Sequence, residues 1–346
     1  MSLVAGLTPA RLIVLLAAFG VSLGLTRAVL RFALTRGVLD MPADRKLHTA
    51  PTPRGGGVGI VIVTLLGTLL AGAIGWIAMP VVLTLGVGGL AVAIVGWIDD
   101  RKGLSPRIRF TVHVLAAVWA VYVLGDIALL RFGWDTTIAR YISTGLSILL
   151  VAWAINAYNF MDGIDALAGS EAAFVGAIGG ALALVSGHAD VAFLSLLIAA
   201  ASLGFLPWNL PPARIFMGDV CSGFLGYCFA ALALFSERHG ALPVIGWLVL
   251  LGVFAFDSTV TLCRRIIERE VWFSTHRSSA YQRVAFRLGR HGPVTAAAMA
   301  VNIVLAGLCW IGWSAPNTWP IVVAGAAGLL TILYFGAERY SPVERG

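Results

Sequence analysis

The chain has 346 residues, of which 59% are hydrophobic and 12% are charged, and its formal net charge is +7. Soluble domains contain about 45–50% apolar and about 25% charged residues, so this composition excludes a soluble globular protein. We predict an all-α polytopic membrane protein that forms a single transmembrane domain over residues 1–346. Its basic loops are expected to meet membrane lipid and not nucleic acid.

Apolar runs of about 20 residues, the length of a membrane-crossing helix, recur along the whole chain. Eleven spans are predicted, at residues 11–32, 57–76, 80–98, 110–130, 138–158, 170–187, 190–207, 219–236, 243–263, 293–313 and 319–336. The first is too long for a signal peptide and lacks a small-residue cleavage site, so we expect a retained helix. Gly20-x-x-x-Gly24 and Gly176-x-x-x-Gly180 are candidate homodimer faces, although packing within one chain is the favoured interpretation.

The four cysteines lie in or beside apolar runs, without the paired spacing of metal sites. They are Cys221, Cys228, Cys263 and Cys309. We predict that they are small buried residues that form no disulfide framework.

The distribution of Lys and Arg predicts the orientation in the membrane. If the N-terminus lies outside, 20 of the 24 basic residues fall in inner segments or at the inner end of the first span. The positive-inside rule therefore favours an outside N-terminus and a cytoplasmic C-terminus. The predicted cytoplasmic loops are 33–56, 99–109, 159–169, 208–218 and 264–292.

The same orientation places three acidic segments on the cytoplasmic side: Asp99-Asp100, the stretch 156–165, and Asp219. Charged groups at membrane depth are costly and by default indicate function. We therefore predict that the loops bring these three segments together at one membrane face. The prediction depends on helix parity, because one miscounted helix between two of them would separate them.

Asp99 and Asp100 end a predicted helix, where the negative end of the macrodipole disfavours a carboxylate by about 0.3–1 kcal/mol. Cations must offset this cost. One interpretation is local ion pairing with a nearby basic residue, namely Arg101, Lys102, Arg107 or Arg109. The other is a Mg²⁺ site or a catalytic base.

The stretch 156–165 holds two amides and two carboxylates, namely Asn156, Asn159, Asp162 and Asp165. The two amides are three residues apart and share one helix face. Hydrogen bonds between helices explain either amide alone, but the whole set favours a functional site.

Asp219 opens a predicted span, where the helix dipole favours a carboxylate, so an ordinary N-cap is the main alternative to function. Asn209, taken alone, is a loop residue. Asp257 lies inside a span and must face protein or water, as a buried structural contact or as a catalytic group.

Two basic loops complete the candidates. Residues 44–57 end in three glycines before a helix, and their backbone N–H groups suit a phosphate, although a plain turn explains them equally well. Residues 264–292 carry seven arginines together with His276 and His291. This second loop either touches anionic lipid or clamps a phosphorylated substrate with bidentate arginine contacts.

Together these motifs resemble one family. The matching residues are Asp99-Asp100, Asn156-Ala-Tyr-Asn159-Phe-Met-Asp162-Gly-Ile-Asp165, Phe216-Met-Gly-Asp219 and His276-Arg-Ser-Ser-Ala-Tyr-Gln-Arg283. The chain resembles the polyprenyl-phosphate N-acetylhexosaminyl-1-phosphate transferases, glycosyltransferase family 4. The last motif is similar to that of the branch that initiates O-antigen in lipopolysaccharide biosynthesis. The resemblance covers about residues 36–291.

The resemblance implies transfer of a sugar-1-phosphate from a UDP-sugar to undecaprenyl phosphate at the bacterial inner membrane, with release of UMP. The cofactor would be Mg²⁺, with Mn²⁺ as a candidate substitute, bound by Asn159 and Asp219. Asp99 and Asp100 would be the essential acidic pair near the lipid phosphate, and Asp162, Asp165 and His276 complete the candidate catalytic residues. The implied substrate-binding residues are Lys46, Asn156, Asn209, Arg277 and Arg283.

The implied phosphate transfer requires positive charge at the site, which Mg²⁺ and the basic residues would supply. Attack by an anionic lipid phosphate on a diphosphate requires Mg²⁺ and Arg or Lys to neutralise the developing charge. A phosphomonoester is already largely ionised at pH 7, so a strong general base is not required. An aspartyl-phosphate intermediate is the alternative to direct attack.

Two departures from the family pattern matter. Cys221 stands where the family often has Gly, which puts the local packing in doubt. The loop has a single His at 276 and not the three-His run of the translocase branch, which argues against a MurNAc-pentapeptide donor. Its resemblance to the O-antigen branch implies a UDP-N-acetylhexosamine, with a 6-deoxy sugar as one candidate. A secondary transporter with an acidic cytoplasmic gate is the alternative function, but transporters place their sites near the bilayer midplane.

The basic loops make the orientation testable. Single cysteines placed at Ser274 and Ser341, in a background without the native cysteines, are expected to react only with membrane-permeant thiol reagents. Labelling of either position by an impermeant reagent applied from outside would contradict the predicted topology.

Overall fold

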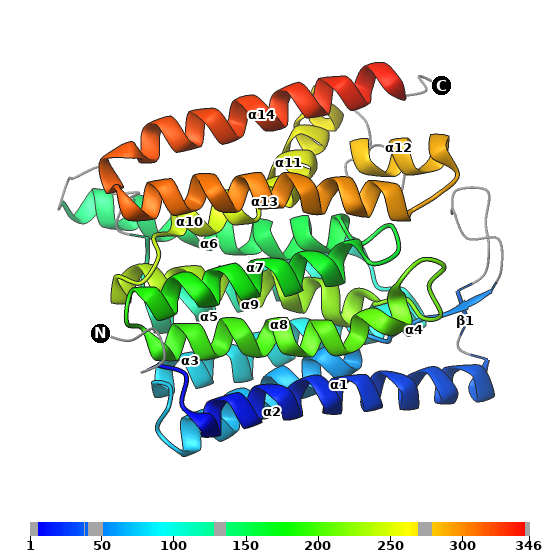
Figure 1. Ribbon diagram of the computed structural model, residues 1–346, viewed down its shortest axis with the longest axis horizontal. Coiled ribbons are helices and arrows are strands. Elements are labelled where there is room, and N and C mark those ends of the chain that lie inside the picture. Colours follow the sequence, from blue (N-terminus) through cyan, green and yellow to red (C-terminus); the bar gives the residue numbers. More distant parts are fainter. Residues whose placement is uncertain (1–5, 38, 41–50, 128–135, 269–278, 343–346) are drawn as a thin grey trace.

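The computed structural model describes residues 6–37, 39–40, 51–127, 136–268 and 279–342, and it is almost entirely helical (Figure 1). The helices are α1 (Pro9–Arg36), α2 (Val58–Ala73), α3 (Met79–Leu83), α4 (Leu90–Lys102), α5 (Pro106–Leu124), α6 (Thr137–Phe160), α7 (Leu167–Val185), α8 (Ala189–Asn209), α9 (Asp219–His239), α10 (Val244–Leu250), α11 (Gly252–Ile267), α12 (Ala280–Leu288), α13 (Gly292–Ser314) and α14 (Trp319–Tyr340). A π-helical stretch, η1 (Thr84–Gly89), joins α3 to α4, and a 3₁₀ turn, η3 (Pro316–Thr318), precedes α14. Two short antiparallel strands pair, β1 (Leu39–Asp40) and β2 (Thr52–Pro53).

The predicted fold class is confirmed. In the described part of the chain, nine helices are long and apolar enough to cross a membrane, and the bent pair α10–α11 makes a tenth if it is one span. The remaining predicted span, 57–76, corresponds to α2, an apolar helix of 16 residues. The number of crossings therefore stays a prediction.

The outer helices present apolar side chains outward, as lipid-facing helices do. Ile13 on α1 is 65% exposed, and Ile321 and Ile332 on α14 are 75% and 71% exposed. Leaving such side chains in water would forgo about 25 cal/mol for each Å² of apolar surface. These faces therefore indicate contact with hydrocarbon.

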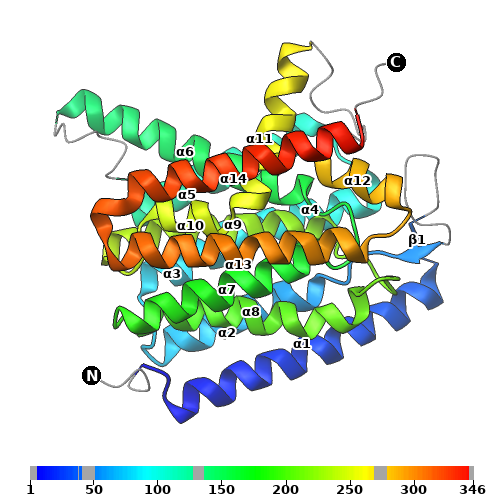
Figure 2. The ribbon, with the colours of Figure 1, turned by 45° about the horizontal axis from the view of Figure 1, so that its top comes forward.

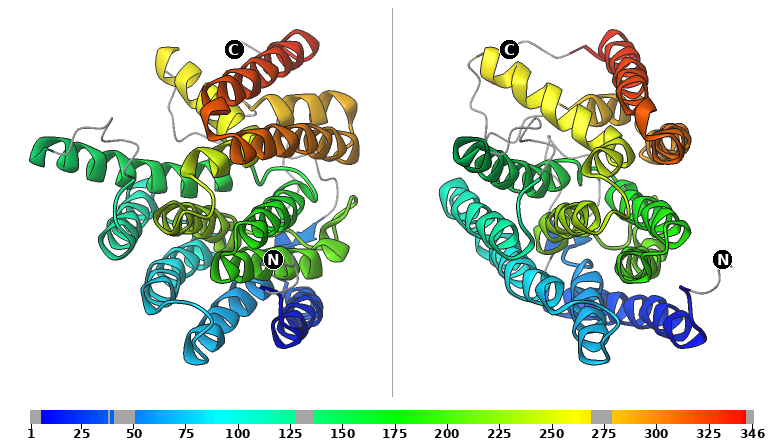
Figure 3. Two further views of the ribbon diagram at one scale, coloured as in Figure 1. Left: turned by 60° about the vertical axis from the view of Figure 1, so that its left-hand side comes forward. Right: turned by 90° about the vertical axis from the view of Figure 1, so that its left-hand side faces the viewer.

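Helix α9 lies near the middle of the bundle, with the other long helices around it (Figure 3). Most of its side chains are buried, including the rings of Phe224, Tyr227 and Phe229. Helices α4 and α6 pack along it. Because α9 begins at Asp219, the packing of α4 and α6 against it determines what surrounds that carboxylate.

The span formed by α10 and α11 is sharply bent. The two helices meet at 83°, so α11 leaves the direction of the bundle (Figure 2). Asp257, the carboxylate predicted inside this span, lies on α11 and is 8% exposed.

Two glycines permit close approach to the first turn of α9. A Cβ atom on Gly96 of α4 would lie 2.2 Å from the Asp219 carbonyl oxygen. A Cβ on Gly57 would lie 2.2 Å from the Cβ of Cys221, which is fully buried. Gly57 therefore leaves the room that Cys221 occupies, which explains how a side chain fits at position 221.

The small-residue motifs differ from each other. Gly176 and Gly180 of α7 pack against α8, as the favoured interpretation predicted, whereas added Cβ atoms on Gly20 and Gly24 would meet open space. A homodimer stays a prediction. Among the cysteines, Cys263 is exposed and the other three are buried, so the prediction of four buried cysteines is wrong for Cys263.

The contact at Gly96 can be tested by substitution. Gly96→Ala is expected to lower the melting temperature of the purified protein, because overpacking typically costs about 1–3 kcal/mol, and to move Asp219 relative to α4. Gly86→Ala in the same apolar segment is the matched control, since nothing lies within 4 Å of its added Cβ. Equal melting temperatures for the two variants would contradict the packing described.

Candidate active site

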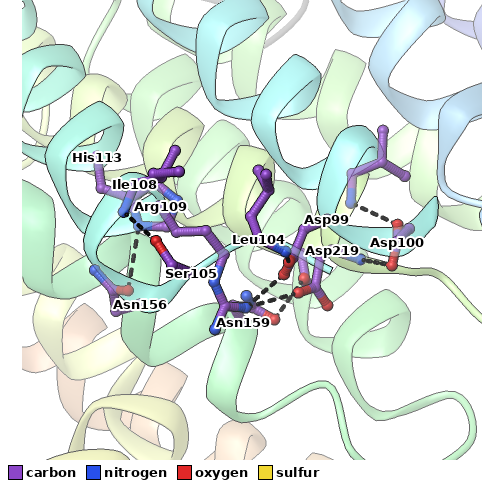
Figure 4. Close-up of polar contacts among 12 residues, drawn as sticks. Asp99, Asp100, Leu104, Ser105, Ile108, Arg109, His113, Asn156, Asn159 and Asp219 are labelled. Carbon is purple, nitrogen blue, oxygen red and sulfur yellow. Dashed lines mark hydrogen bonds and ion pairs between the residues drawn. The ribbon is translucent and has the colours of Figure 1, made fainter. Parts of the chain in front are cut away.

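The three acidic segments meet at one end of the bundle, as the sequence predicts (Figure 4). The Asp100 carboxylate accepts hydrogen bonds from the backbone at the start of α9, 119 residues further along the chain. Ser222, on the first turn of α9, donates to Asn159 Oδ1 at 3.1 Å. These contacts confirm the convergence of the segments, whereas the assignment of this end to the cytoplasm stays a prediction.

Asp100 caps the N-terminus of α9. Its Oδ1 accepts from the Asp219 backbone N–H at 3.0 Å, and its Oδ2 accepts from the Val220 N–H at 3.1 Å. The first N–H groups of a helix have no partner within the helix, and the positive end of the dipole attracts a carboxylate. The Arg54 guanidinium lies 3.5 Å away. Asp100 therefore has a defined structural contact whatever its role in chemistry.

Asp99 faces a different set of partners. Its Oδ2 is 2.6 Å from Arg109 Nη1, and the same nitrogen is 3.3 Å from Asp219 Oδ2. Figure 4 shows the Arg109 guanidinium bridging these two carboxylates. Among the basic residues considered as local partners, Arg109 forms the ion pair with Asp99, while Arg101 lies over the Trp97 ring.

The two amides of α6 have separate surroundings. Asn159 lies beside the first turn of α9 through Ser222. Asn156 donates from Nδ2 to the Ala152 carbonyl, and its Oδ1 is 3.2 Å from Nδ1 of His113. Because that oxygen accepts, the facing ring nitrogen carries a proton. Residue 113 follows Arg109 by one helical turn on α5, so both lie on one helix face.

Asp165 and Asn209 connect the loops behind the cluster. Asp165 is 7% exposed, accepts from the Ala213 N–H at 3.0 Å, and lies 3.0 Å from Nδ1 of His291. Asn209 accepts from the Ala166 N–H at 2.9 Å and donates to the Ile215 carbonyl at 2.9 Å. Both side chains join the loop between α6 and α7 to the loop that precedes α9.

Asp162 lies beyond the end of α6 and is half-buried. Burial raises its pKa well above the usual value for aspartate, and the nearby carboxylates of Asp219 and Asp100 raise the pKa further, whereas Arg54 lowers it. The raised pKa therefore reflects burial of the carboxyl group first and the neighbouring carboxylates second.

The triple-glycine loop does not offer all its amides to a phosphate. The N–H groups of Gly56 and Gly57 donate to the carbonyls of Phe216 and Met217 at 2.9 and 3.0 Å. The interpretation of these two amides as a phosphate cradle is therefore wrong, because they bind the segment that precedes α9. The loop instead positions Arg54 beside Asp100.

The remaining predicted residues are not part of this cluster as described. Lys46, His276 and Arg277 lie outside the described residues. The Arg283 side chain is 5% exposed, and its guanidinium contacts Glu338 Oε2 and the Ser341 carbonyl, both at 2.9 Å. Its assignment to substrate binding stays a prediction.

The sequence analysis did not single out His113 or Ser222, and it treated Arg109 only as a local counter-charge. It included Arg54 and His291 only as members of the basic loops 44–57 and 264–292. The helical spacing from Arg109 to His113 was a usable signal. Arg54, Ser222 and His291 gave no such signal, because their partners are distant in sequence.

The oxygen donors here fit a hard divalent cation. Within the described residues, the carboxyl groups of Asp99, Asp100, Asp162 and Asp219 outnumber the guanidiniums of Arg54 and Arg109, so the ionised forms of all four lack a full set of cationic partners. No group of three His, Cys, Asp or Glu side chains in that part of the chain could hold a metal by itself. This arrangement suits Mg²⁺, which usually binds one or two carboxylates and completes its shell with substrate phosphates and water.

An apolar cavity lies between α6, α9, α10 and α11, and none of the residues of the acidic cluster lines it. Its walls include Ala157 and Tyr158, which directly precede Asn159 on α6, and the rings of Phe229, Trp247 and Phe254. The Tyr158 hydroxyl donates to the Ala168 carbonyl at 2.7 Å, so its polar atom is satisfied. A polar site and an apolar cavity on one helix suit a substrate with a charged head and a hydrocarbon chain.

Comparison with known proteins gives matches over this same region. The family described as glycosyl transferase family 4 matches residues 82–237, which hold Asp99, Asp100, Asn159 and Asp219. The chain is 30% identical over 282 residues to a probable undecaprenyl-phosphate N-acetylglucosaminyl 1-phosphate transferase of Bacillus subtilis, covering 79% of this chain and 78% of that protein. It is 33% identical to a decaprenyl-phosphate N-acetylglucosaminephosphotransferase of Mycolicibacterium smegmatis, covering 70% and 69%. A phospho-N-acetylmuramoyl-pentapeptide-transferase of Shouchella clausii is 34% identical, covering 60% and 66%.

The contacts of Asp99 and Asp100 predict different effects on stability. Asp100→Asn places an amide donor against a backbone donor of α9, so it should lower the free energy of unfolding by about 1 kcal/mol, the usual cost of losing a cap. Asp99→Asn keeps an acceptor for the Leu104 N–H, and Arg109 keeps Asp219, so stability should be maintained. Thermal unfolding of both variants checks this, and an Asp100→Asn protein as stable as wild type would contradict the cap.

The raised pKa of Asp162 predicts that the stability of the folded protein depends on pH. In the unfolded chain this carboxyl ionises near pH 3.9, whereas in the folded protein it holds its proton to higher pH. The stability contributed by the protonated form is therefore lost as the pH rises through the folded pKa. Without divalent metal, Asp162→Asn should gain melting temperature over wild type, and the gain should grow with pH. A gain that is constant between pH 4 and 8 would contradict the assignment.

Proposed function

Because the chain belongs to glycosyl transferase family 4, we propose that it transfers an N-acetylhexosamine 1-phosphate from a UDP-sugar to a polyprenyl phosphate and releases UMP. The observation that carries this proposal is the polar cluster of Asp99, Asp219 and Asn159 with the bridging Arg109. The same helix α6 also lines an apolar cavity, at Ala157 and Tyr158. The cluster suits the phosphates of both substrates, and the cavity suits the hydrocarbon chain of the lipid.

The reaction exchanges one phosphoanhydride bond for another. An oxygen of the lipid phosphate attacks the phosphorus that carries the sugar, and the bond from that phosphorus to the bridging oxygen breaks. The electron pair of the broken bond stays on UMP, while the sugar keeps its bond to phosphate. The attacking phosphate is largely ionised at neutral pH, so no residue needs to remove a proton from it.

The side chains of the site supply charge and position. Arg109 lies between Asp99 and Asp219, and Arg54 lies beside Asp100. These carboxylates hold both guanidiniums at the site, where they would stabilise negative charge that develops on phosphate oxygens. Asp100 keeps the first turn of α9 in register with α4. Asp99 then serves to orient Arg109, which agrees with direct attack on the diphosphate.

Asn159 and Asp219 are the residues that would hold Mg²⁺, or Mn²⁺ in its place. When bound there, the ion would neutralise charge on the diphosphate and polarise its oxygens. Removing divalent metal with a chelator is expected to abolish transfer.

For the donor we propose UDP-N-acetylglucosamine or a related N-acetylhexosamine, since relatives from Bacillus and Mycolicibacterium carry N-acetylglucosamine in their names. The His276-Arg277 motif adds a 6-deoxy sugar to the candidates and favours a role in O-antigen synthesis. Membership of the family argues against the alternative function, a secondary transporter.

The proposal is tested with purified protein in detergent. Undecaprenyl phosphate and decaprenyl phosphate are each offered with a panel of UDP-sugars, and both UMP and the sugar diphospholipid are quantified. Asp219→Asn should reduce turnover by about 10²-fold or more in folded protein, as expected for a residue in the chemical site. Asp190→Asn, which changes an aspartate in the first turn of α8, is the matched control and should keep full activity. Absence of UMP release with every donor would overturn the proposed function.

A further inference from the structure

Helix α12 is a short helix outside the candidate spans, and a carboxylate from another helix caps it. The N–H groups of Ala280 and Tyr281 donate to Oδ1 and Oδ2 of Asp257 on α11, each at 3.0 Å. Thr261 Oγ1 also donates to Asp257 Oδ1, at 3.0 Å. The N-cap residue of α12, Ser279, forms no side-chain cap of its own. Asp257 therefore supplies the partners that the first turn of α12 lacks.

The capped turn presents Tyr281 to the end of α6. The Tyr281 hydroxyl donates to the Phe160 carbonyl at 3.0 Å, and the Arg265 guanidinium of α11 lies 5.6 Å from the Phe160 ring centroid. A Cβ atom on Gly163 would lie 2.4 Å from the Tyr281 hydroxyl oxygen and 2.3 Å from Gln282 Nε2. The α11–α12 corner thus contacts residue 160 at both its ring and its carbonyl, and it packs closely on the backbone that follows.

The contacted backbone is the segment that carries the site. Phe160 follows Asn159 directly, and Asp162 comes two residues later. Carbonyls at the end of a helix lack partners within the helix, so an outside donor decides how the last turn is held. Tyr281 supplies that donor.

We propose that Asp257 and Tyr281 are positioning residues for the transferase site, an inference that rests on the proposed function. Asp257 fixes the first turn of α12, Tyr281 fixes the Phe160 carbonyl, and the end of α6 then keeps Asn159 and Asp162 in place beside α9. Neither residue needs to touch a substrate. The chain of contacts gives the buried Asp257 carboxylate a role at the site without placing it in the chemistry.

A second tether of α12 provides a control. Arg283 joins α12 to α14 through Glu338 and the Ser341 carbonyl. Glu338 Oε2 also lies 3.5 Å from Arg264 Nη1 on α11, so Glu338→Gln weakens the contacts of α14 with both α12 and α11. It removes no atom of the contact between Tyr281 and Phe160. If α12 mattered only for general stability, weakening either tether would have the same consequence.

The experiment compares Tyr281→Phe, Asp257→Asn and Glu338→Gln by hydrogen exchange and by steady-state kinetics. Tyr281→Phe keeps the ring and removes one hydrogen bond, so faster amide exchange is expected within residues 159–166 at an almost unchanged melting temperature. Its kcat should fall by about 10-fold, with KM for the UDP-sugar little changed, because misplaced groups slow the chemical step more than they weaken binding. Glu338→Gln should leave both exchange in that segment and kcat as in wild type.

The double variant Asp257→Asn/Tyr281→Phe should lose no more activity than the more impaired single variant, because both changes act on the same backbone. Unchanged exchange within residues 159–166 in Tyr281→Phe, or an equal loss of kcat in Glu338→Gln, would overturn the proposal. A wild-type protein inactive on every donor would overturn the proposed function instead. The exchange measurement alone would then decide whether Tyr281 fixes the end of α6.

Discussion

The hydrogen bonds from the first turn of α9 to the Asp100 carboxylate join segments that are 119 residues apart. They place the C-terminal end of α4 against the N-terminal end of α9. The positive end of the α9 dipole favours the carboxylate that α4 supplies there. Gly96 permits this contact, because a side chain there would meet the Asp219 carbonyl. Without the contact between α4 and α9, Asp99 and Asp219 would not share the Arg109 guanidinium, which joins the two carboxylates of the site.

The same kind of helix cap, a carboxylate supplied by another helix, occurs twice in the molecule. Asp100 caps α9 from α4, and Asp257 caps α12 from α11. In both cases a carboxylate of one helix satisfies the free N–H groups of another, which joins elements more specifically than apolar packing does. Apolar contacts between helices gain little in a lipid environment, so polar contacts at helix ends contribute much to the relative placement of the helices.

Apolar runs and basic loops were sufficient to predict the fold class, and helix parity was sufficient to predict that Asp99-Asp100, residues 156–165 and Asp219 meet. The individual contacts were not predictable, because they join residues whose separation in sequence carries no signal. Glu171, fully buried in α7, bonds Asn302 of α13 across 131 residues and was not anticipated. Of the two interpretations of the triple glycine, the phosphate site was wrong for Gly56 and Gly57, because their amides bind a segment that only the folded chain brings alongside.

The central claim is that the first turn of α9, together with the end of α6, holds the metal and the diphosphate of the donor. Mn²⁺ is a suitable probe, since it accepts the same oxygen ligands as Mg²⁺ and scatters X-rays anomalously. Crystals grown with Mn²⁺ and a UDP-sugar should show an anomalous peak within ligand distance of the Asp219 carboxylate and the Asn159 amide oxygen. A bound nucleotide sugar whose metal lies away from both residues would contradict the account.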